Sequence, residues 1–174
     1  FFVDKDGNTL YQPICNQYSV NSSINNKLLF VREDGKYNGK IGLMNLETGE
    51  IVQPFVYSEN SDWINGVAVI LDENEQYGML DNSGKVIIPI GKYNQILPLN
   101  NGAVLVDNGG ALNLLDTQGK LLVELTAVED INVELSDDFI AMQKEGKWGA
   151  INEKGKTVLP FEYDQIIAEP NPGI

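Results

Sequence analysis

The stretch from Phe139 to Ile166, FIAMQKEGKWGAINEKGKTVLPFEYDQI, decides the fold. Two apolar segments flank Glu145-Gly146, and a two-residue loop ending in Gly is typical of a tight β-hairpin. An Asn152-x-x-Gly155 turn follows, in which the Asn side chain caps the backbone and the glycine adopts the left-handed conformation. A third segment rich in β-branched residues then runs to a proline. The stretch therefore predicts a three-stranded antiparallel meander.

The same pattern recurs along the chain with a period of about 35 residues, which is typical of a repeat architecture. The glycines that close the turns are Gly7, Gly49, Gly84, Gly119 and Gly155, and a proline follows three of them, at Pro54, Pro89 and Pro160. We expect each proline to end its strand, because proline cannot donate to the ladder. One meander of this size is marginal in water, so the copies must bury their apolar faces against one another.

These observations predict an all-β fold of tandem three-stranded antiparallel meanders in a curved or solenoid-like array. A closed, propeller-like ring of short blades is the alternative. We expect one domain over residues 1–174, with a partial leading unit at 1–27, full units at about 28–64, 65–100, 101–137 and 138–168, and a tail at 169–174. A compact domain of this length has a radius of gyration of about 16 Å, so solution scattering distinguishes an open array, whose value is larger.

The charge of the chain excludes some classes of partner. Twelve basic and 25 acidic residues give a net charge of −13, and no basic stripe is visible. Binding a nucleic-acid backbone needs such a stripe, and an anionic membrane surface repels this charge. No apolar segment approaches the length of a membrane span. The chain opens with Phe1-Phe2 inside a repeat, so we interpret it as a piece of a longer protein.

The residue types argue against an enzyme. The chain has no histidine, which removes the commonest general base and zinc ligand, and we interpret its one cysteine, Cys15, as a small buried residue. Calcium loops and paired carboxylates for glycoside hydrolysis remain minor alternatives. Their candidates are Asp4 to Gly7 for calcium, and Asp72 to Glu75 with Asp137-Asp138 for catalysis. We expect no catalytic residue, no metal and no cofactor.

The last copy resembles the WG-repeat family. The residues that carry the resemblance are Gly146-Lys147-Trp148-Gly149, Ile151, Gly155, Lys156, Val158, Pro160, Tyr163, Asp164 and Ile166. The aromatic–glycine pair becomes Tyr77-Gly78 in the second copy, Ile41-Gly42 in the first and Leu112-Asn113 in the third. The resemblance implies a β-rich bacterial repeat protein, often at the cell surface or secreted, and it supplies no catalytic residue.

The aromatic residues are the candidates for a binding site. Trp148 stands where other copies have Tyr77, Ile41 and Leu112, so we interpret it as a packing residue between units. Trp63 has no aromatic counterpart, which makes it the best candidate for a ligand contact, although a core position is the alternative. Tyr57, Tyr93 and Tyr163 recur in the links between units and are further candidates.

Two functions fit these observations. The first is a non-catalytic repeat module, serving as a protein-binding or scaffold region of a larger bacterial protein, because repeat arrays offer extended surfaces without a pocket. The second is a carbohydrate or cell-envelope binding module that uses exposed aromatic residues. The expected partner is therefore a protein or a glycan, with no nucleic acid and no insertion into a membrane.

Overall fold

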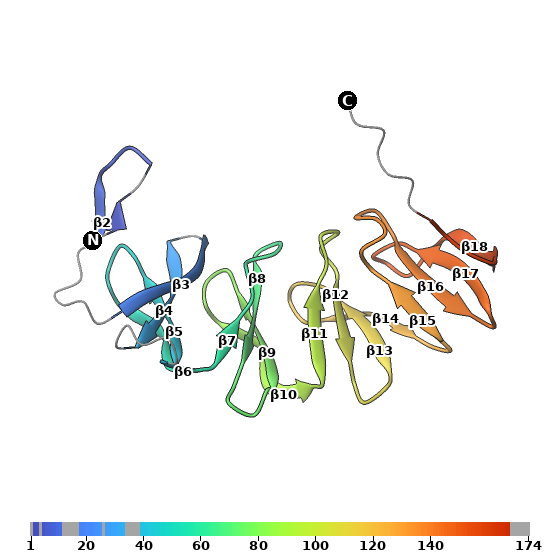
Figure 1. The fold of residues 1–174 in the computed structure, drawn as a ribbon, viewed down its shortest axis with the longest axis horizontal. Helices are drawn as coiled ribbons and strands as arrows, with labels where there is room; N and C mark the ends of the chain where they lie inside the picture. The colour runs from blue at the N-terminus through green and yellow to red at the C-terminus, as the bar shows by residue number, and fades with distance from the viewer. Residues whose placement is uncertain (1, 4, 12–17, 26, 34–38, 168–174) are drawn as a thin grey trace. The chain divides into compact units, whose positions relative to one another are not determined.

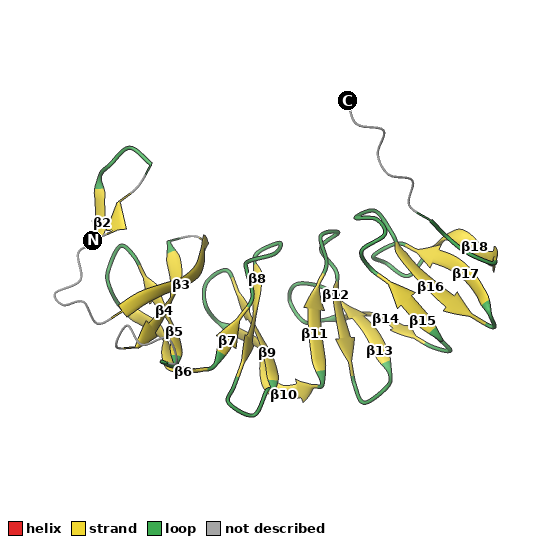
Figure 2. Ribbon diagram, viewed as in Figure 1, coloured by secondary structure: helices red, strands yellow, loops and turns green. Residues whose placement is uncertain are grey.

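The computed structural model describes residues 2–3, 5–11, 18–25, 27–33 and 39–167, and side chains for fewer of them near the N-terminus. Within these ranges every regular element is a β-strand, and Figure 2 shows strands joined only by loops and turns. The expected all-β fold is confirmed, and none of the sheets closes into a barrel. Cys15, which we interpret as a small buried residue, and Asp4, which belongs to the minor calcium-loop alternative, lie outside the described residues.

The strands form a short hairpin and four antiparallel sheets of four strands each (Figure 1). The hairpin joins β1 (Phe2–Val3) and β2 (Thr9–Tyr11). The first sheet contains β3 (Tyr18–Asn25), β4 (Leu28–Glu33), β5 (Ile41–Asn45) and β6 (Ile51–Tyr57). The second contains β7 (Glu59–Asn60), β8 (Val67–Leu71), β9 (Tyr77–Asp81) and β10 (Val86–Tyr93).

The two remaining sheets follow the same order of strands along the chain. The third contains β11 (Gln95–Pro98), β12 (Val104–Asp107), β13 (Leu112–Leu115) and β14 (Leu121–Leu125). The fourth contains β15 (Asp130–Asn132), β16 (Ile140–Lys144), β17 (Lys147–Ile151) and β18 (Thr157–Tyr163). Within each sheet, strands that follow one another in sequence are neighbours, so every sheet is a meander.

The sheets contain one strand more than the sequence predicts. The three strands of each predicted meander are present, and the link before them supplies a fourth at one edge: β3, β7, β11 or β15. These added strands are short in the second and fourth sheets, where Glu59–Asn60 and Asp130–Asn132 carry few apolar residues. Links of this composition give no alternating apolar pattern, which is why the sequence does not reveal them.

The prolines lie inside strands, and the expectation that they end them is wrong. Pro54, Pro89 and Pro160 fall within β6, β10 and β18, which continue to Tyr57, Tyr93 and Tyr163. Each of these strands is an edge strand, and its register with the neighbouring strand shifts around the proline. An edge strand at a bulge tolerates a residue that cannot donate a hydrogen bond, so the ladder resumes beyond it.

The turn glycines close the Asx-x-x-Gly turns at positive φ. The N–H of each glycine donates to the carbonyl of the Asx residue, at 2.8 Å for Gly49 and 2.9 Å for the later three. The φ angles of Gly49, Gly84, Gly119 and Gly155 lie between 73° and 83°. This is the left-handed region that glycine adopts without a steric penalty. The hairpin at Glu145-Gly146 also has positive φ at both residues, 51° and 72°, as a tight turn requires.

The described chain divides into two compact units, residues 1–96 and 97–174. In the first unit, the first and second sheets share a core. Leu28, Phe30, Ile41, Leu43 and Tyr57 from the first sheet pack with Ala68, Ile70 and Leu80 from the second. Gln53 adds a polar link, since its Nε2 donates to the carbonyl of Gly84 at 2.8 Å.

In the second unit, the third and fourth sheets pack in the same way. Leu105, Leu114 and Leu125 of the third sheet share a core with Ile140, Met142 and Ile151 of the fourth. The turn glycine of the later sheet meets the earlier sheet in both units. A Cβ on Gly84 would lie 2.8 Å from Val52, and one on Gly155 would lie 2.9 Å from Val123. These glycines therefore serve sheet packing as well as the turn.

Candidate functional site

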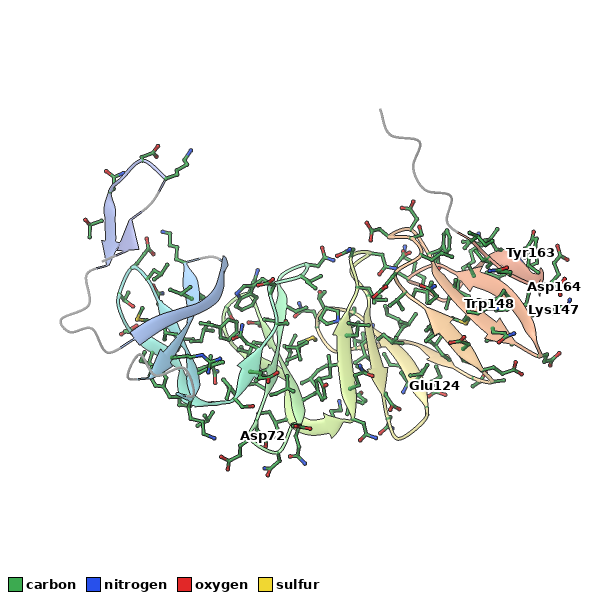
Figure 3. The ribbon with its side chains drawn as sticks, in the orientation of Figure 1. Asp72, Glu124, Lys147, Trp148, Tyr163 and Asp164 are labelled. Carbon is green, nitrogen blue, oxygen red and sulfur yellow. The ribbon has the colours of Figure 1, made fainter. Side chains whose placement is uncertain are left out.

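A row of four residues crosses the fourth sheet, one from each strand. Asp130 of β15 pairs with Gln143 of β16, Gln143 pairs with Trp148 of β17, and Trp148 pairs with Tyr163 of β18. Direct cross-strand partners project their side chains to the same face of a sheet. We call these four residues the Trp148 row. Figure 3 shows Trp148 and Tyr163 together on this sheet, with Lys147 and Asp164 beside them.

The Trp148 row lies on the face of the fourth sheet that points away from the core. Met142 pairs with Gly149 and Ile140 with Ile151, and the core of the second unit contains Met142, Ile140 and Ile151. Because side chains alternate along a strand, Trp148 projects to the opposite face. Trp148 itself is half-buried. The sequence predicts a packing residue between units here, whereas in the described structure one side of Trp148 lines a cavity.

The residues equivalent to Trp148 in the first and third sheets pack against the sheet that follows. Ile41 is fully buried in the core that the first sheet shares with the second. Leu112 packs against the core that the third sheet shares with the fourth. On the fourth sheet Trp148 is half-buried and a cavity lies beside it, and we call this face the open face.

The open face contains a cavity of about 720 Å³, which we call the Trp148 cavity. Residues from β15 and the segment after it form one side, Trp148 lies between, and the segment after β18 forms the other. The lining residues are Asp130, Ile131, Asn132, Val133, Glu134, Leu135, Trp148, Asp164, Gln165 and Ile166. The cavity thus combines one aromatic ring, several aliphatic side chains and three carboxylates.

The lining of the Trp148 cavity is acidic. Among the described residues that line it there is no Lys or Arg. Lys147, next to the cavity, donates a hydrogen bond of 2.5 Å from Nζ to Asp164 Oδ1. This hydrogen bond and the charge of Lys147 lower the pKa of Asp164. Asp130 Oδ1 accepts the N–H of Ile131 at 2.8 Å, which fixes that carboxylate at the edge of the sheet.

A smaller cavity of about 360 Å³ lies at the matching position of the second sheet. Tyr77, which stands where the fourth sheet has Trp148, is half-buried and lines it. Glu59, Asp72, Glu73 and Glu75 also line it, so this cavity is acidic too. Here the chain supplies a cation of its own, because Lys40 Nζ lies 2.6 Å from Glu73 Oε2.

The predicted binding residues do not come together in one site. Trp63 is half-buried against the core of the first unit, where its ring stacks on Phe30 at 5.5 Å and 24°. The expectation that Tyr57 is exposed is wrong: it is 3% exposed, and its hydroxyl donates to Gln53 Oε1 at 2.8 Å. Tyr93 is half-buried beneath Lys92, whose Nζ lies 5.1 Å from the ring centroid. Tyr163 is 41% exposed and belongs to the Trp148 row.

The sequence pattern does not predict that the carboxylates of the cavity lie together. Asp130 and Glu134 stand in a link without apolar alternation, and Asp164 stands in the Tyr-Asp-Gln-Ile link. Their shared position follows from the pairing of β15 with β16 and β17 with β18, which no local motif records. The one available signal is the Tyr-x-Gln-Ile pattern that the link at Asp164 shares with the link at Tyr93 to Ile96.

The other acidic candidates lie in turns. Asp72 Oδ1 accepts the N–H groups of Asn74 and Gln76, both at 2.9 Å, and these backbone hydrogen bonds lower its pKa. Asp137 accepts a hydrogen bond from the Asn100 side chain at 2.8 Å. Among the described residues, no group of three or more acidic or cysteine side chains is arranged to hold a metal. The same residues include no helix of the length and apolarity needed to cross a membrane.

Comparison with protein families shows what kind of chain this is. The model of the WG containing repeat matches residues 1–37, 77–110 and 148–170, which together make up more than half of the chain. The chain belongs to the WG containing repeat family, as the resemblance in the last copy indicates. It is an all-β repeat module. A comparison with curated proteins finds no match.

Several solved structures are distantly similar. BamB from Moraxella catarrhalis is 14% identical, with a TM-score of 0.40 over 78% of this chain and 47% of BamB. The designed protein Ika8 is 13% identical, with a TM-score of 0.40 over 86% of this chain and 51% of Ika8. PorZ, a surface component of the type-IX secretion system of Porphyromonas gingivalis, is 14% identical, with a TM-score of 0.38 over 97% of this chain and 26% of PorZ. This chain spans about half the length of these proteins or less, and similarities this low carry no information on function.

Proposed function

We propose that this chain is a non-catalytic repeat module that binds another protein through the open face of its fourth sheet. One observation supports the proposal above the others. The position of Trp148 is occupied in the first and third sheets by Ile41 and Leu112, which the next sheet covers. A face whose counterparts pack against polypeptide is suited to pack against a polypeptide of another chain.

The chemistry of the open face also fits a protein partner. A large aromatic residue at the centre of a surface, with a polar rim, is typical of the positions that dominate binding energy in protein interfaces. Trp148 occupies such a central position in its row, with Asp130 and Gln143 on one side and Tyr163 on the other. The absence of histidine from the whole sequence supports a binding role over a catalytic one.

A carbohydrate ligand is the second candidate, and one observation favours it. Trp148 and Tyr163 are direct cross-strand partners, so two aromatic side chains lie side by side on one face. The amide side chains of Asn132 and Gln165 line the same cavity and offer both donors and acceptors. Adjacent aromatic rings with nearby amides suit the apolar faces and hydroxyl groups of a sugar.

Selection from a random-peptide display library, together with a glycan array, tests the proposal on the full chain. We expect peptides that bind the chain and lose binding to a Trp148→Leu variant. That variant copies the residue of the third sheet, so it keeps an apolar side chain and removes the aromatic ring. Glycans that depend on Trp148, without any such peptide, would support the second candidate. If neither peptides nor glycans depend on Trp148, the open face is not the binding site.

A further inference from the structure

The loop between β12 and β13 contains an asparagine followed by two glycines (Figure 1). Asn108, Gly109, Gly110 and Ala111 are all exposed, and the Asn108 N–H donates to the Ala111 carbonyl at 2.9 Å. Gly109 and Gly110 have positive φ angles of 69° and 95°, as the two central residues of a type I′ hairpin turn require. Asn108 is therefore the residue that immediately precedes the two central residues of the turn.

An asparagine followed by glycine has a reaction of its own. The backbone nitrogen of the glycine attacks the side-chain Cγ of the asparagine, and the new C–N bond closes a succinimide ring. The side-chain nitrogen leaves as ammonia, with the proton that the glycine nitrogen loses. Water then opens the ring at one of its two carbonyl groups and gives aspartate or isoaspartate. Glycine favours the attack, because it has no side chain to crowd the approaching nitrogen.

Neither of the two reacting groups is held at Asn108. In the described part of the chain, the Asn108 side chain and the Gly109 N–H have no hydrogen-bond partner. The turn is closed by backbone groups of its first and fourth residues, so the N–H of Gly109 takes no part in it. Asp107 Oδ1 accepts the N–H of Gly110 at 2.7 Å, one residue beyond the reacting bond. The glycine nitrogen can therefore reach Cγ without first losing a hydrogen bond.

The pair Asn101-Gly102 is held at both reacting groups. The Gly102 N–H donates to the Leu99 carbonyl at 3.1 Å, and Asn101 Oδ1 accepts the N–H of Ala103 at 3.0 Å. Both hydrogen bonds must break before the ring closes, and each one of ordinary strength slows the reaction about five-fold. Asn101 and Gly102 are also half-buried. We therefore expect this pair to react slowly in the folded protein.

The pair Asn65-Gly66 is held by its turn. Ile64 and Val67 enclose the pair with two reciprocal backbone hydrogen bonds of 2.9 and 3.0 Å. Asn65 is itself a central residue of this turn, with a φ of 49°, so the rotation that brings the glycine nitrogen to Cγ would disrupt the turn. The sequence has one further pair, Asn38-Gly39, and its asparagine lies outside the described residues.

We propose that Asn108 is a site of spontaneous deamidation in the folded protein, where it reacts faster than Asn65 and Asn101. The product adds a negative charge beside Asp107 in a chain whose net charge is −13. In the isoaspartate form the backbone runs through the former side chain, so the connection between β12 and β13 becomes one atom longer. The loop is not among the residues that line the Trp148 cavity, so the reaction is independent of the proposed function.

Incubation of the full chain at physiological temperature and pH, followed by digestion and mass spectrometry, tests the proposal. Conversion of an asparagine raises the mass of its peptide, and fragmentation of the peptide assigns the residue. We expect Asn108 to convert at least about five-fold faster than Asn65 or Asn101, the factor expected from one hydrogen bond. Equal rates at the three sites, or an Asn108 that stays intact, would overturn the proposal.

The same incubation in concentrated urea separates the effect of the fold from that of the local sequence. Unfolding removes the hydrogen bonds around Asn65 and Asn101, so we expect both to accelerate and the three rates to become similar. If Asn108 exceeds the others in urea by the same factor, the fold does not select it. Asn74 controls for exposure: it is exposed but followed by Glu75, and we expect it to convert more slowly than Asn108 in both conditions.

Two variants identify the reacting side chain. Asn108→Gln keeps an amide, but its longer side chain would have to close a larger ring, so we expect conversion at this position to fall to the background. The matched control, Asn101→Gln, leaves the rate at Asn108 unchanged. Circular dichroism of both variants shows that the β structure is retained. A peptide that gains mass equally in the Asn108→Gln variant would place the reaction at another residue and overturn the proposal.

Discussion

The two tryptophans of this chain have opposite surroundings. Trp63 packs against the core that the first and second sheets share, with its ring stacked on Phe30. Trp148 projects from the fourth sheet away from the core and lines an acidic cavity. Trp63 stands in an irregular link, and Trp148 stands at a position of the repeat that has an equivalent in each of the other full copies. The difference teaches that a repeated position predicts which face a side chain takes, while its burial depends on whether another sheet covers that face.

The largest effect should follow removal of the Trp63 ring. We expect Trp63→Ala to lower the free energy of unfolding by about 3–4 kcal/mol, because it empties a site between two sheets. Urea denaturation followed by circular dichroism measures this loss. A loss below about 1 kcal/mol would show that Trp63 contributes little to the core, and the contrast with Trp148 would fail.

The glycine beside Trp148 is the next most sensitive position. A Cβ on Gly149 would lie 2.7 Å from Phe161 Cγ and 2.9 Å from the Leu159 carbonyl oxygen. We expect Gly149→Ala to cost about 1–3 kcal/mol, since the ring and the edge strand must both shift. The matched control is Gly146→Ala, whose Cβ meets nothing within 4 Å and whose cost comes from its positive φ of 72°. If the Gly149→Ala variant unfolds with the same free energy as the original chain, the close packing of Gly149 against Phe161 is contradicted.

Removal of the Trp148 ring should cost less than removal of Trp63. Because one side of Trp148 faces the cavity, less apolar surface is lost from the interior, and we expect Trp148→Ala to cost about 1–2 kcal/mol. The same denaturation experiment compares the two variants directly. If Trp148→Ala proves as costly as Trp63→Ala, the ring is covered in solution and the open face does not exist in that form.

The smallest effect concerns the ion pair beside the cavity. The hydrogen bond and charge of Lys147 hold the pKa of Asp164 below the ordinary value of 3.8. A depressed folded-state pKa contributes stability above the unfolded-state pKa, and that contribution is lost as the pH falls through the folded-state value. Nuclear magnetic resonance titration of the Asp164 carboxyl should show the low pKa, and Lys147→Met should raise it towards 3.8. An unchanged pKa in the variant would mean that the pair does not form in solution.

Much of the fold follows from local chemistry that the sequence displays. Asn152 and Gly155 specify a turn through their own backbone preferences, and Glu145-Gly146 specify a hairpin in the same way. Neither depends on distant residues. The fourth strand of each sheet was missed because Asp130–Asn132 and Glu59–Asn60 become strands only by pairing with an existing edge. The continuation of β18 beyond Pro160 likewise depends on a bulge against β17.

The candidate site was predicted less well than the fold. Of the aromatic residues proposed as ligand contacts, Tyr163 lies in the Trp148 row and Tyr57 is buried. Trp148 was interpreted as a packing residue because its equivalents are Ile41 and Leu112, and in their own sheets those residues do pack against the core. The equivalence gives the face to which a side chain projects, but it does not give how much of that side chain is buried.

The sequence by itself determined the repeat, the all-β class, the turns and the alternation of faces, because each of these depends on residues within a few positions of one another. Only the tertiary structure decided which faces are covered and which carboxylates meet. Asp130 and Asp164 line one cavity although a whole meander separates them in sequence. Their proximity arises from the pairing of four strands and from the outward face of Trp148, and burial of a side chain is a property of its neighbours in space.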